Sequence, residues 1–180
     1  MAKWIIDPNH AVAEFTVYHM MVTPVHGQFN SVKGSVEFDP ADPGAMSVEV
    51  EIEAAGLYTG VERRDNHLRS ADFFDVASFP AITFKSTTVT VIALNNVIIT
   101  GDLTMHGITR SIAFRANFIG PSKFYDDELK QMYTTFGFHA TASIDREDFG
   151  MMWNVGIEDG GFMVGKTIDL AFNAEIDREE

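Results

Sequence analysis

The 180-residue chain contains no cysteine, which excludes disulfide bonds, a thiol nucleophile and a thiolate metal site. Basic residues are also scarce: 13 Lys and Arg stand against 26 Asp and Glu, a formal net charge of −13. A surface with this charge repels phosphate backbones and disfavours adsorption to anionic lipid, so we expect no nucleic-acid partner. No apolar run approaches the ~18 residues of a membrane-spanning helix, and we expect no membrane insertion.

The N-terminus, MAKWIIDPNH, reaches Asp7 after only a few apolar residues and is too short for the core of a signal peptide. We therefore expect a cytoplasmic protein. Its composition is that of a globular protein, with 46% apolar and 22% charged residues and 15 Phe. A chain of this length can bury a substantial core, and no linker or close repeat divides it, so residues 1–180 are expected to form a single domain.

Apolar and polar residues alternate along most of the chain, and this period predicts strands. The clearest case is 46–54, where Val48, Val50 and Ile52 alternate with serine and glutamate. Eight segments carry such a pattern: 11–18, 27–38, 46–54, 81–88, 97–105, 108–118, 134–144 and 166–176. Long alternating strands joined by turns indicate an all-β protein, either a closed barrel or a sandwich. Eight strands can enclose packed side chains or one small ligand.

Turn residues predict how these strands are joined. His106-Gly107 fits a two-residue hairpin turn, and Asn95-Asn96 is a second hairpin signal. We expect strand 27–38 to bend at Gly34. Gly120 begins a segment that we interpret as a long acidic loop.

The segment 59–80 differs from the rest because charges are dense and helical signals are clear. Thr59 and Glu62 have the spacing of a capping box, which predicts a short helix over 60–69. The apolar stripe of this helix is thin, so burial of one face is not its main anchor. Phenylalanines follow directly, and we expect them to dock the segment onto an apolar surface.

Arg64, Asp65 and His67 are the strongest candidates for chemistry, because an aspartate that orients a histidine can make a general base. No nucleophile stands beside them. The simpler interpretation is that they tie the helix to the rim of the barrel, and a third is that they meet the polar head of a ligand. The six histidines form no established metal-binding spacing, so we expect no metal site, and no cofactor motif is present.

Several groups of residues occur in a characteristic order and spacing. They are Trp4-x-Ile6-Asp7-Pro8-x-His10, Phe15-x-Val17-x-His19-Met20, Gly27-x-Phe29, Thr59 with Arg64-Asp65-x-His67-Leu68, Asp72-Phe73-Phe74-Asp75-Val76, Phe79-Pro80-x-Ile82-x-Phe84, Gly101-Asp102-Leu103-Thr104-x-His106-Gly107-x-Thr109 and Ile144-Asp145-Arg146-x-Asp148-Phe149-Gly150-Met151. Together they make nearly the whole chain similar to the YceI-like family of lipocalin-like, polyisoprenoid-binding proteins. The chain departs from the family at Ala11, where members often carry serine, and over 121–133, which does not align.

The resemblance implies an eight-stranded antiparallel lipocalin-like barrel with one short helix near residues 60–70. Its lumen would hold an isoprenoid, such as a polyprenyl or quinone-type lipid, or another long-chain amphiphile. No catalytic residues and no cofactor come with the resemblance, and a homodimer is compatible with it. Many members carry a signal peptide and are periplasmic, whereas this N-terminus has none, so that location does not transfer.

We therefore predict a lipid-binding or carrier protein, not an enzyme. The residues expected to line the lumen are Phe15, Val17, Val48, Val50, Ile52, Phe84, Leu103, Ile112, Phe114, Phe138 and Phe172. The head-group candidates are Arg64, Asp65 and His67. Two alternatives remain: an enzyme acting on such a lipid with Asp65 and His67 as acid and base, and a filled barrel that serves as an interaction module through 124–133 and 151–153.

Overall fold

The computed structural model describes residues 1–158 and 160–179. These residues form ten strands, one α-helix and three short 3-10 helices: β1 (Ala2–His19), β2 (Thr23–Phe29), β3 (Val32–Phe38), η1 (Pro43–Ala45), β4 (Ser47–Glu53), η2 (Ala54–Gly56), β5 (Leu57–Tyr58), α1 (Glu62–Arg69), β6 (Ala81–Ala93), β7 (Asn96–Met105), β8 (Ile108–Asp126), β9 (Gln131–Asp145), η3 (Arg146–Phe149) and β10 (Val164–Glu179). Within those ranges no helix has the length and hydrophobicity to cross a membrane.

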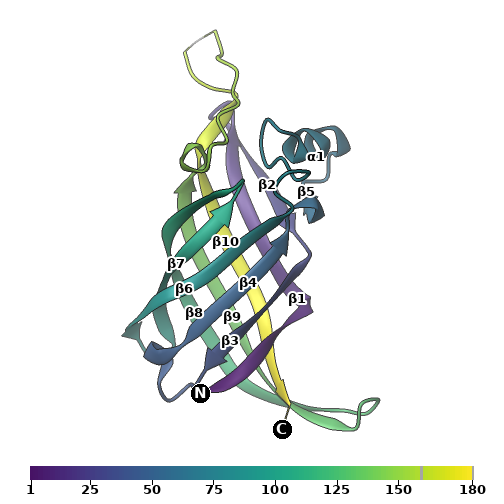
Figure 1. Cartoon of the computed structure of the whole chain (residues 1–180), viewed down its shortest axis with the longest axis vertical. Coiled ribbons are helices and arrows are strands. Elements are labelled where there is room, and N and C mark those ends of the chain that lie inside the picture. Colours follow the sequence, from purple (N-terminus) through teal and green to yellow (C-terminus); the bar gives the residue numbers. More distant parts are fainter. Residues whose placement is uncertain (159, 180) are drawn as a thin grey trace.

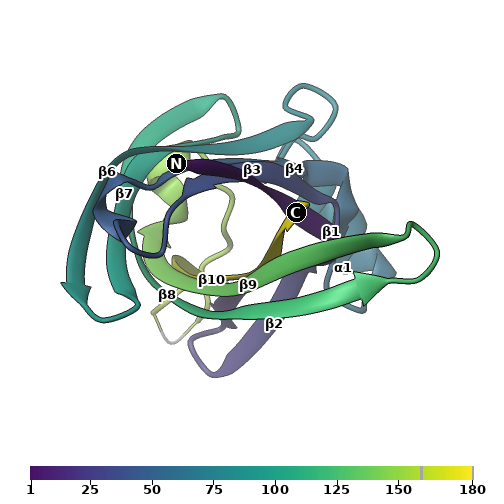
Figure 2. The same cartoon turned by 90° about the horizontal axis from the view of Figure 1, so that it is seen from below.

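Eight of the strands close into an antiparallel barrel. The ring runs β1-β3-β4-β6-β7-β8-β9-β10, and β10 pairs with β1 to close it (Figures 1 and 2). Two further strands lie outside this ring order, because β2 pairs with β1 and β5 adds to β2. The prediction of an all-β, eight-stranded antiparallel barrel with one short helix is confirmed. Closure leaves the ring without an edge and separates an inner from an outer face.

The strand expected at 27–38 is two strands, and the interruption comes before Gly34, where we expected a bend. The chain breaks at Asn30 and Ser31, and Gly34 lies within β3. Both strands use the same edge of β1, since β3 pairs with residues 2–5 and β2 with residues 13–19. Because of the break, β2 and β3 can both pair with the long strand β1. The segment after Gly120 also differs from the expected loop, because β8 and β9 continue into it as a hairpin that projects from the barrel (Figure 1).

The predicted turn at His106-Gly107 is confirmed. Both residues have positive φ, 50° and 72°, as in the primed turns that join twisted strands. A side chain at Gly107 would collide with the ring of Phe79. The Nδ1 atom of His106 lies 2.9 Å from the carbonyl oxygen of Phe149, which ties this turn to η3.

The end of the barrel that holds both chain termini is filled with aromatic rings, which we call the aromatic plug: Trp4, Phe38, Phe118 and Phe136. Phe38 is at its centre, with ring centroids 5.1 Å from those of Phe118 and Phe136 in edge-on contact. The indole nitrogen of Trp4 donates to the Phe38 carbonyl over 3.0 Å. These contacts seal one end of the barrel, while α1 lies at the other end (Figure 1).

Candidate ligand-binding cavity

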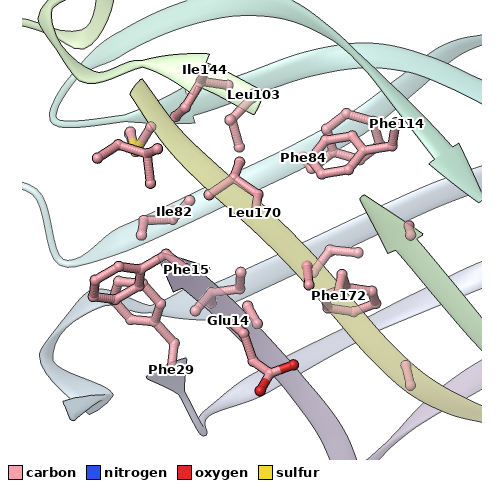
Figure 3. Close-up of a pocket in the computed structure, with 18 of the residues that line it drawn as sticks. Glu14, Phe15, Phe29, Ile82, Phe84, Leu103, Phe114, Ile144, Leu170 and Phe172 are labelled. Carbon is pink, nitrogen blue, oxygen red and sulfur yellow. The ribbon is translucent and has the colours of Figure 1, made fainter. Parts of the chain in front are cut away.

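A cavity of about 180 Å³ lies inside the barrel, and nearly all of the side chains around it are apolar (Figure 3). Ten of the eleven residues predicted to face the lumen line it: Phe15, Val17, Val48, Val50, Ile52, Phe84, Leu103, Phe114, Phe138 and Phe172. The eleventh, Ile112, packs against the core beside the cavity. That these residues contact a ligand remains a prediction.

The period of two along each strand places these side chains inside. Phe84, Phe114 and Phe172 are only partly buried, although they point inward, because part of each ring faces the cavity. The rings of Phe84 and Phe114 meet edge-on, with their centroids 5.2 Å apart; both residues are labelled in Figure 3. Glu14 also borders the cavity, but its carboxylate is turned outward and accepts a 2.9 Å hydrogen bond from Asn173. The wall of the lumen is therefore apolar along the strands.

Residues 59–80, which we call the cover segment, close the other end of the cavity. Leu68, Phe73 and Phe74 of this segment line the cavity. Phe74 packs edge-on against Phe29 of β2 at 5.4 Å. Arg69 fastens α1 to the barrel, because its guanidinium donates to the carbonyl oxygens of Ala55 and Leu57. The expectation that phenylalanines dock this segment onto an apolar surface is confirmed.

The capping box predicted at Thr59 and Glu62 is wrong. The helix begins at Glu62, and its N-cap residue, Val61, makes no side-chain capping bond. Thr59 instead belongs to a clamp, in which its amide donates to Oδ1 of Asp65 over 3.0 Å and its hydroxyl donates to the same oxygen. Arg64 donates to the Thr59 hydroxyl over 2.7 Å and to the Thr59 carbonyl over 2.8 Å. These bonds hold the entry to the helix without a cap.

The three head-group candidates do not line the cavity. Arg64 and Asp65 are engaged in the Thr59 clamp, and the Asp65 side chain is buried, with 4% of its surface exposed. His67 bonds through Nε2 to Asp72 over 2.8 Å, and its ring contacts that of Trp153 at 4.6 Å. Asp65 and His67 thus have separate partners. The geometry favours the simpler interpretation, in which these residues hold the cover segment in place.

A buried charge at the cover end of the cavity was not singled out from the sequence. Arg146, in η3, lines the cavity and is 2% exposed. Its guanidinium donates to the carbonyl oxygens of Gly165 (3.0 Å), Val164 (3.4 Å) and Met151. Burial lowers the pKa of this guanidinium, and the neighbouring Glu147 and Asp145 carboxylates oppose that shift. The sequence places Arg146 in the motif that begins at Ile144, but nothing in the spacing of that motif indicates a buried side chain.

A second cluster that the sequence did not predict lies on the outer surface. Asp7, His10 and Glu175 place one ligand atom each within 4.8 Å of one another, and clusters this exposed are common without a metal ion. Nδ1 of His10 is 2.6 Å from Asp7 and 3.6 Å from Glu175. The hydrogen bond to Asp7 and the charges of Glu175 and Asp7 raise the pKa of His10. Pairing of β1 with β10 brings these distant residues together.

Comparison with known protein families shows which family this chain belongs to. Residues 4–176 match the model of the YceI-like domain. The chain belongs to the YceI-like family. The UPF0312 protein of Pseudomonas savastanoi is 36% identical over 176 residues, which cover 97% of this chain and 85% of the relative. The UPF0312 protein of Staphylococcus aureus is 36% identical over 180 residues, the whole of both chains.

Solved structures share the YceI-like architecture. BcnA from Burkholderia cenocepacia superposes with a TM-score of 0.79 at 21% identity, covering 94% of this chain and 98% of BcnA. A mutant Campylobacter jejuni YceI protein with a monobromobimane guest gives 0.71 at 25% identity, covering 91% and 90%. A polyisoprenoid binding domain from Saccharophagus degradans gives 0.70 at 13% identity, covering 96% and 97%. At their low identities, the first and third of these show the fold alone.

Proposed function

We propose that this YceI-like barrel binds a long-chain apolar or amphiphilic lipid in its lumen, with an isoprenoid tail as the preferred class. The observation that carries the proposal is the apolar cavity, which lies between the aromatic plug and the cover segment. A polyisoprenoid binding domain with the same fold supports the ligand class. Membership of the YceI-like family supports binding as the activity.

Burial of the tail supplies the affinity in this proposal. Each buried methylene contributes about 0.8 kcal/mol, so ten of them contribute about 8 kcal/mol before the cost of immobilising the ligand is subtracted. The cavity of about 180 Å³ is smaller than the roughly 300–1,000 Å³ of pockets that enclose drug-sized ligands. A long tail therefore enters fully only if lumen side chains rotate or the cover segment shifts.

The two alternative functions have less support from the geometry. An enzyme with Asp65 and His67 as acid and base needs these groups to act together, but their side chains bond to Thr59 and Asp72 respectively. A barrel used only as an interaction module would be filled, whereas this lumen retains a cavity. We propose a binding protein without chemistry of its own.

Binding of prenyl lipids to delipidated protein, followed by native mass spectrometry, tests the proposal. Ala13 lines the cavity, so the larger side chain of Ala13→Phe fills part of the lumen. Ala113→Phe is a matched control, because Ala113 is exposed on the outer face of β8. We expect one prenyl alcohol per wild-type or Ala113→Phe molecule and at least about tenfold weaker binding by Ala13→Phe, a difference of about 1.4 kcal/mol.

Thermal melts of the two variants check that each is folded. The proposal is refuted if the wild-type protein purifies empty and binds neither prenyl nor acyl probes. It is also refuted if Ala13→Phe, folded like the control, binds the same probes as tightly as the wild type.

A further inference from the structure

The polarity of the cavity is uneven. Glu14 and Arg146 are the charged residues among the described residues that border it, and only Arg146 is buried. Arg146 lies beside Phe73 of the cover segment, with its guanidinium carbon 6.0 Å from the centroid of that ring. Met151 and Val164, whose carbonyl oxygens accept from Arg146, also line the cavity. The aromatic plug lies at the opposite end, so the lumen has one charged end and one apolar end.

Carbonyl oxygens hold the guanidinium in place, and Glu147 and Asp145 act on its charge without forming an ion pair with it. Arginine has five N–H donors, and three of them have acceptors here, all of which are uncharged carbonyl oxygens. In the part of the chain that the structure describes, Arg146 forms no ion pair. The acids beside it in sequence are engaged elsewhere: Asp145 accepts from the amide of Glu147, and Glu147 pairs with Lys166 at 2.7 Å.

A buried charge without a counter-ion is unfavourable, and an arginine does not escape that cost by losing its proton. An anion in the cavity would supply the missing charge. It would also accept hydrogen bonds from the two remaining N–H donors, one on each terminal nitrogen. The three carbonyl contacts fix the guanidinium before a ligand arrives, so little side-chain freedom is lost on binding.

We propose that Arg146 binds the anionic head group, a carboxylate or phosphate, of an amphiphile whose tail points toward the aromatic plug. This inference rests on the proposed lipid-binding function and adds to it the class and position of the head group. Arg64, Asp65 and His67, the head-group candidates from the sequence, then have no direct contact with the ligand.

A series of ligands with the same tail tests the assignment in the wild-type protein. Hexadecanoate, hexadecyl phosphate, hexadecanol and hexadecylamine are titrated into delipidated protein at one ionic strength, and dissociation constants are measured by calorimetry. We expect each of the two anions to bind at least about tenfold more tightly than the alcohol, because charge-assisted hydrogen bonds are stronger than neutral ones. The amine should bind most weakly. Comparison of the two anions identifies the preferred head group.

The variant Arg146→Met is expected to remove the preference for anions while leaving hexadecanol affinity within about threefold of the wild-type value. Arg115→Met is the control, because Arg115 is exposed on the outer face of β8 and its loss changes net charge equally. If Arg146→Met does not fold, an NMR titration of the wild-type protein that follows the ¹H–¹⁵N resonance of Arg146 Nε takes the place of that variant. That resonance should shift with hexadecanoate and not with hexadecanol.

Equal affinity of wild-type protein for hexadecanol and both anions overturns the inference and leaves the proposed function standing. Failure of every ligand to bind refutes the proposed function itself. Inorganic phosphate is added alone as a further arm. If it shifts the Arg146 resonance as hexadecyl phosphate does, at the same concentration, the site takes free anions and its assignment to a lipid head group is overturned.

Discussion

The lumen has a part filled by the aromatic plug and a part that contains the cavity, and alanine substitution of one phenylalanine in each should show the difference. Phe38 belongs to the aromatic plug and is 1% exposed. Its ring centroid lies 5.1–6.2 Å from those of four other aromatic residues: Trp4, Phe118, Phe136 and Phe138. Phe172 lines the cavity and is only partly buried, although its side chain also points inward.

The expected cost differs because only Phe38 is packed on all sides. Phe38→Ala leaves a void in close-packed rings, and such substitutions cost about 3–5 kcal/mol. Phe172→Ala enlarges an existing cavity, so we expect it to lose only part of the transfer free energy of the ring, about 1–2 kcal/mol. At about 2–4 °C per kcal/mol for a chain of this size, Tm should fall by about 6–20 °C for Phe38→Ala and about 2–8 °C for Phe172→Ala.

Urea unfolding of both variants, followed by circular dichroism, measures the loss in free energy of unfolding that each substitution causes. The two losses can be compared directly, because both variants replace a phenylalanine by alanine. Equal m-values are needed so that the midpoints report stability alone. If Phe172→Ala is as costly as Phe38→Ala, the lumen is packed along its whole length. The distinction between a plug and a cavity would then be wrong.

Three other measurements test particular contacts. Asp65→Ala removes the acceptor that clamps the start of α1 and should lower the free energy of unfolding by about 1–3 kcal/mol in denaturant titrations, with Asp65→Asn retaining part of it; an unchanged midpoint would contradict the clamp. Trp153→Phe should remove most of the change in tryptophan emission that a bound lipid causes, because Trp153 contacts the cover segment whereas Trp4 does not line the cavity; persistence of the full change would contradict a ligand beside the cover segment. NMR titration should show His10 deprotonating above its ordinary value of 6.5, chiefly through its bond to Asp7, and Glu175→Gln should reduce this upward shift. Because the folded-state pKa is raised, the stabilisation from His10 is present at low pH and lost as pH rises through that pKa; a titration at or below 6.5 would contradict the contact.

Alternation along the strands predicts the lumen well, because a period of two assigns each side chain to one face of a closed sheet. Val48, Val50 and Ile52 therefore line the cavity as expected. The break at 30–31 also leaves a period-two signal, because the buried residues change from odd positions in β2, such as Phe29, to even positions in β3, such as Val32 and Val36. Alternation cannot separate Ile112, which packs in the core wall, from inward residues that border open space.

Sequence patterns do not predict two polar features of the structure, the Thr59 clamp and the burial of Arg146. Thr59 and Glu62 have the spacing of a capping box, but Asp65 offers Thr59 a competing acceptor once the cover segment docks. Arg146 lies between two acids, yet it is buried because the carbonyl oxygens of 151 and 164–165 converge on it. The clamp is local, spanning five and six residues, but its spacing is not that of a capping box. The contacts of Arg146 with Val164 and Gly165 span 18 and 19 residues, so they do not follow from local spacing.

The most direct test of a lipid-binding lumen is electron density in crystals of protein loaded with one prenyl alcohol. We predict continuous density for the tail inside the barrel, beginning beside Phe73 of the cover segment and ending against Phe138 near the aromatic plug. An empty cavity in crystals of a complex that native mass spectrometry shows to be fully loaded, with the ligand on the outer surface, would contradict the account.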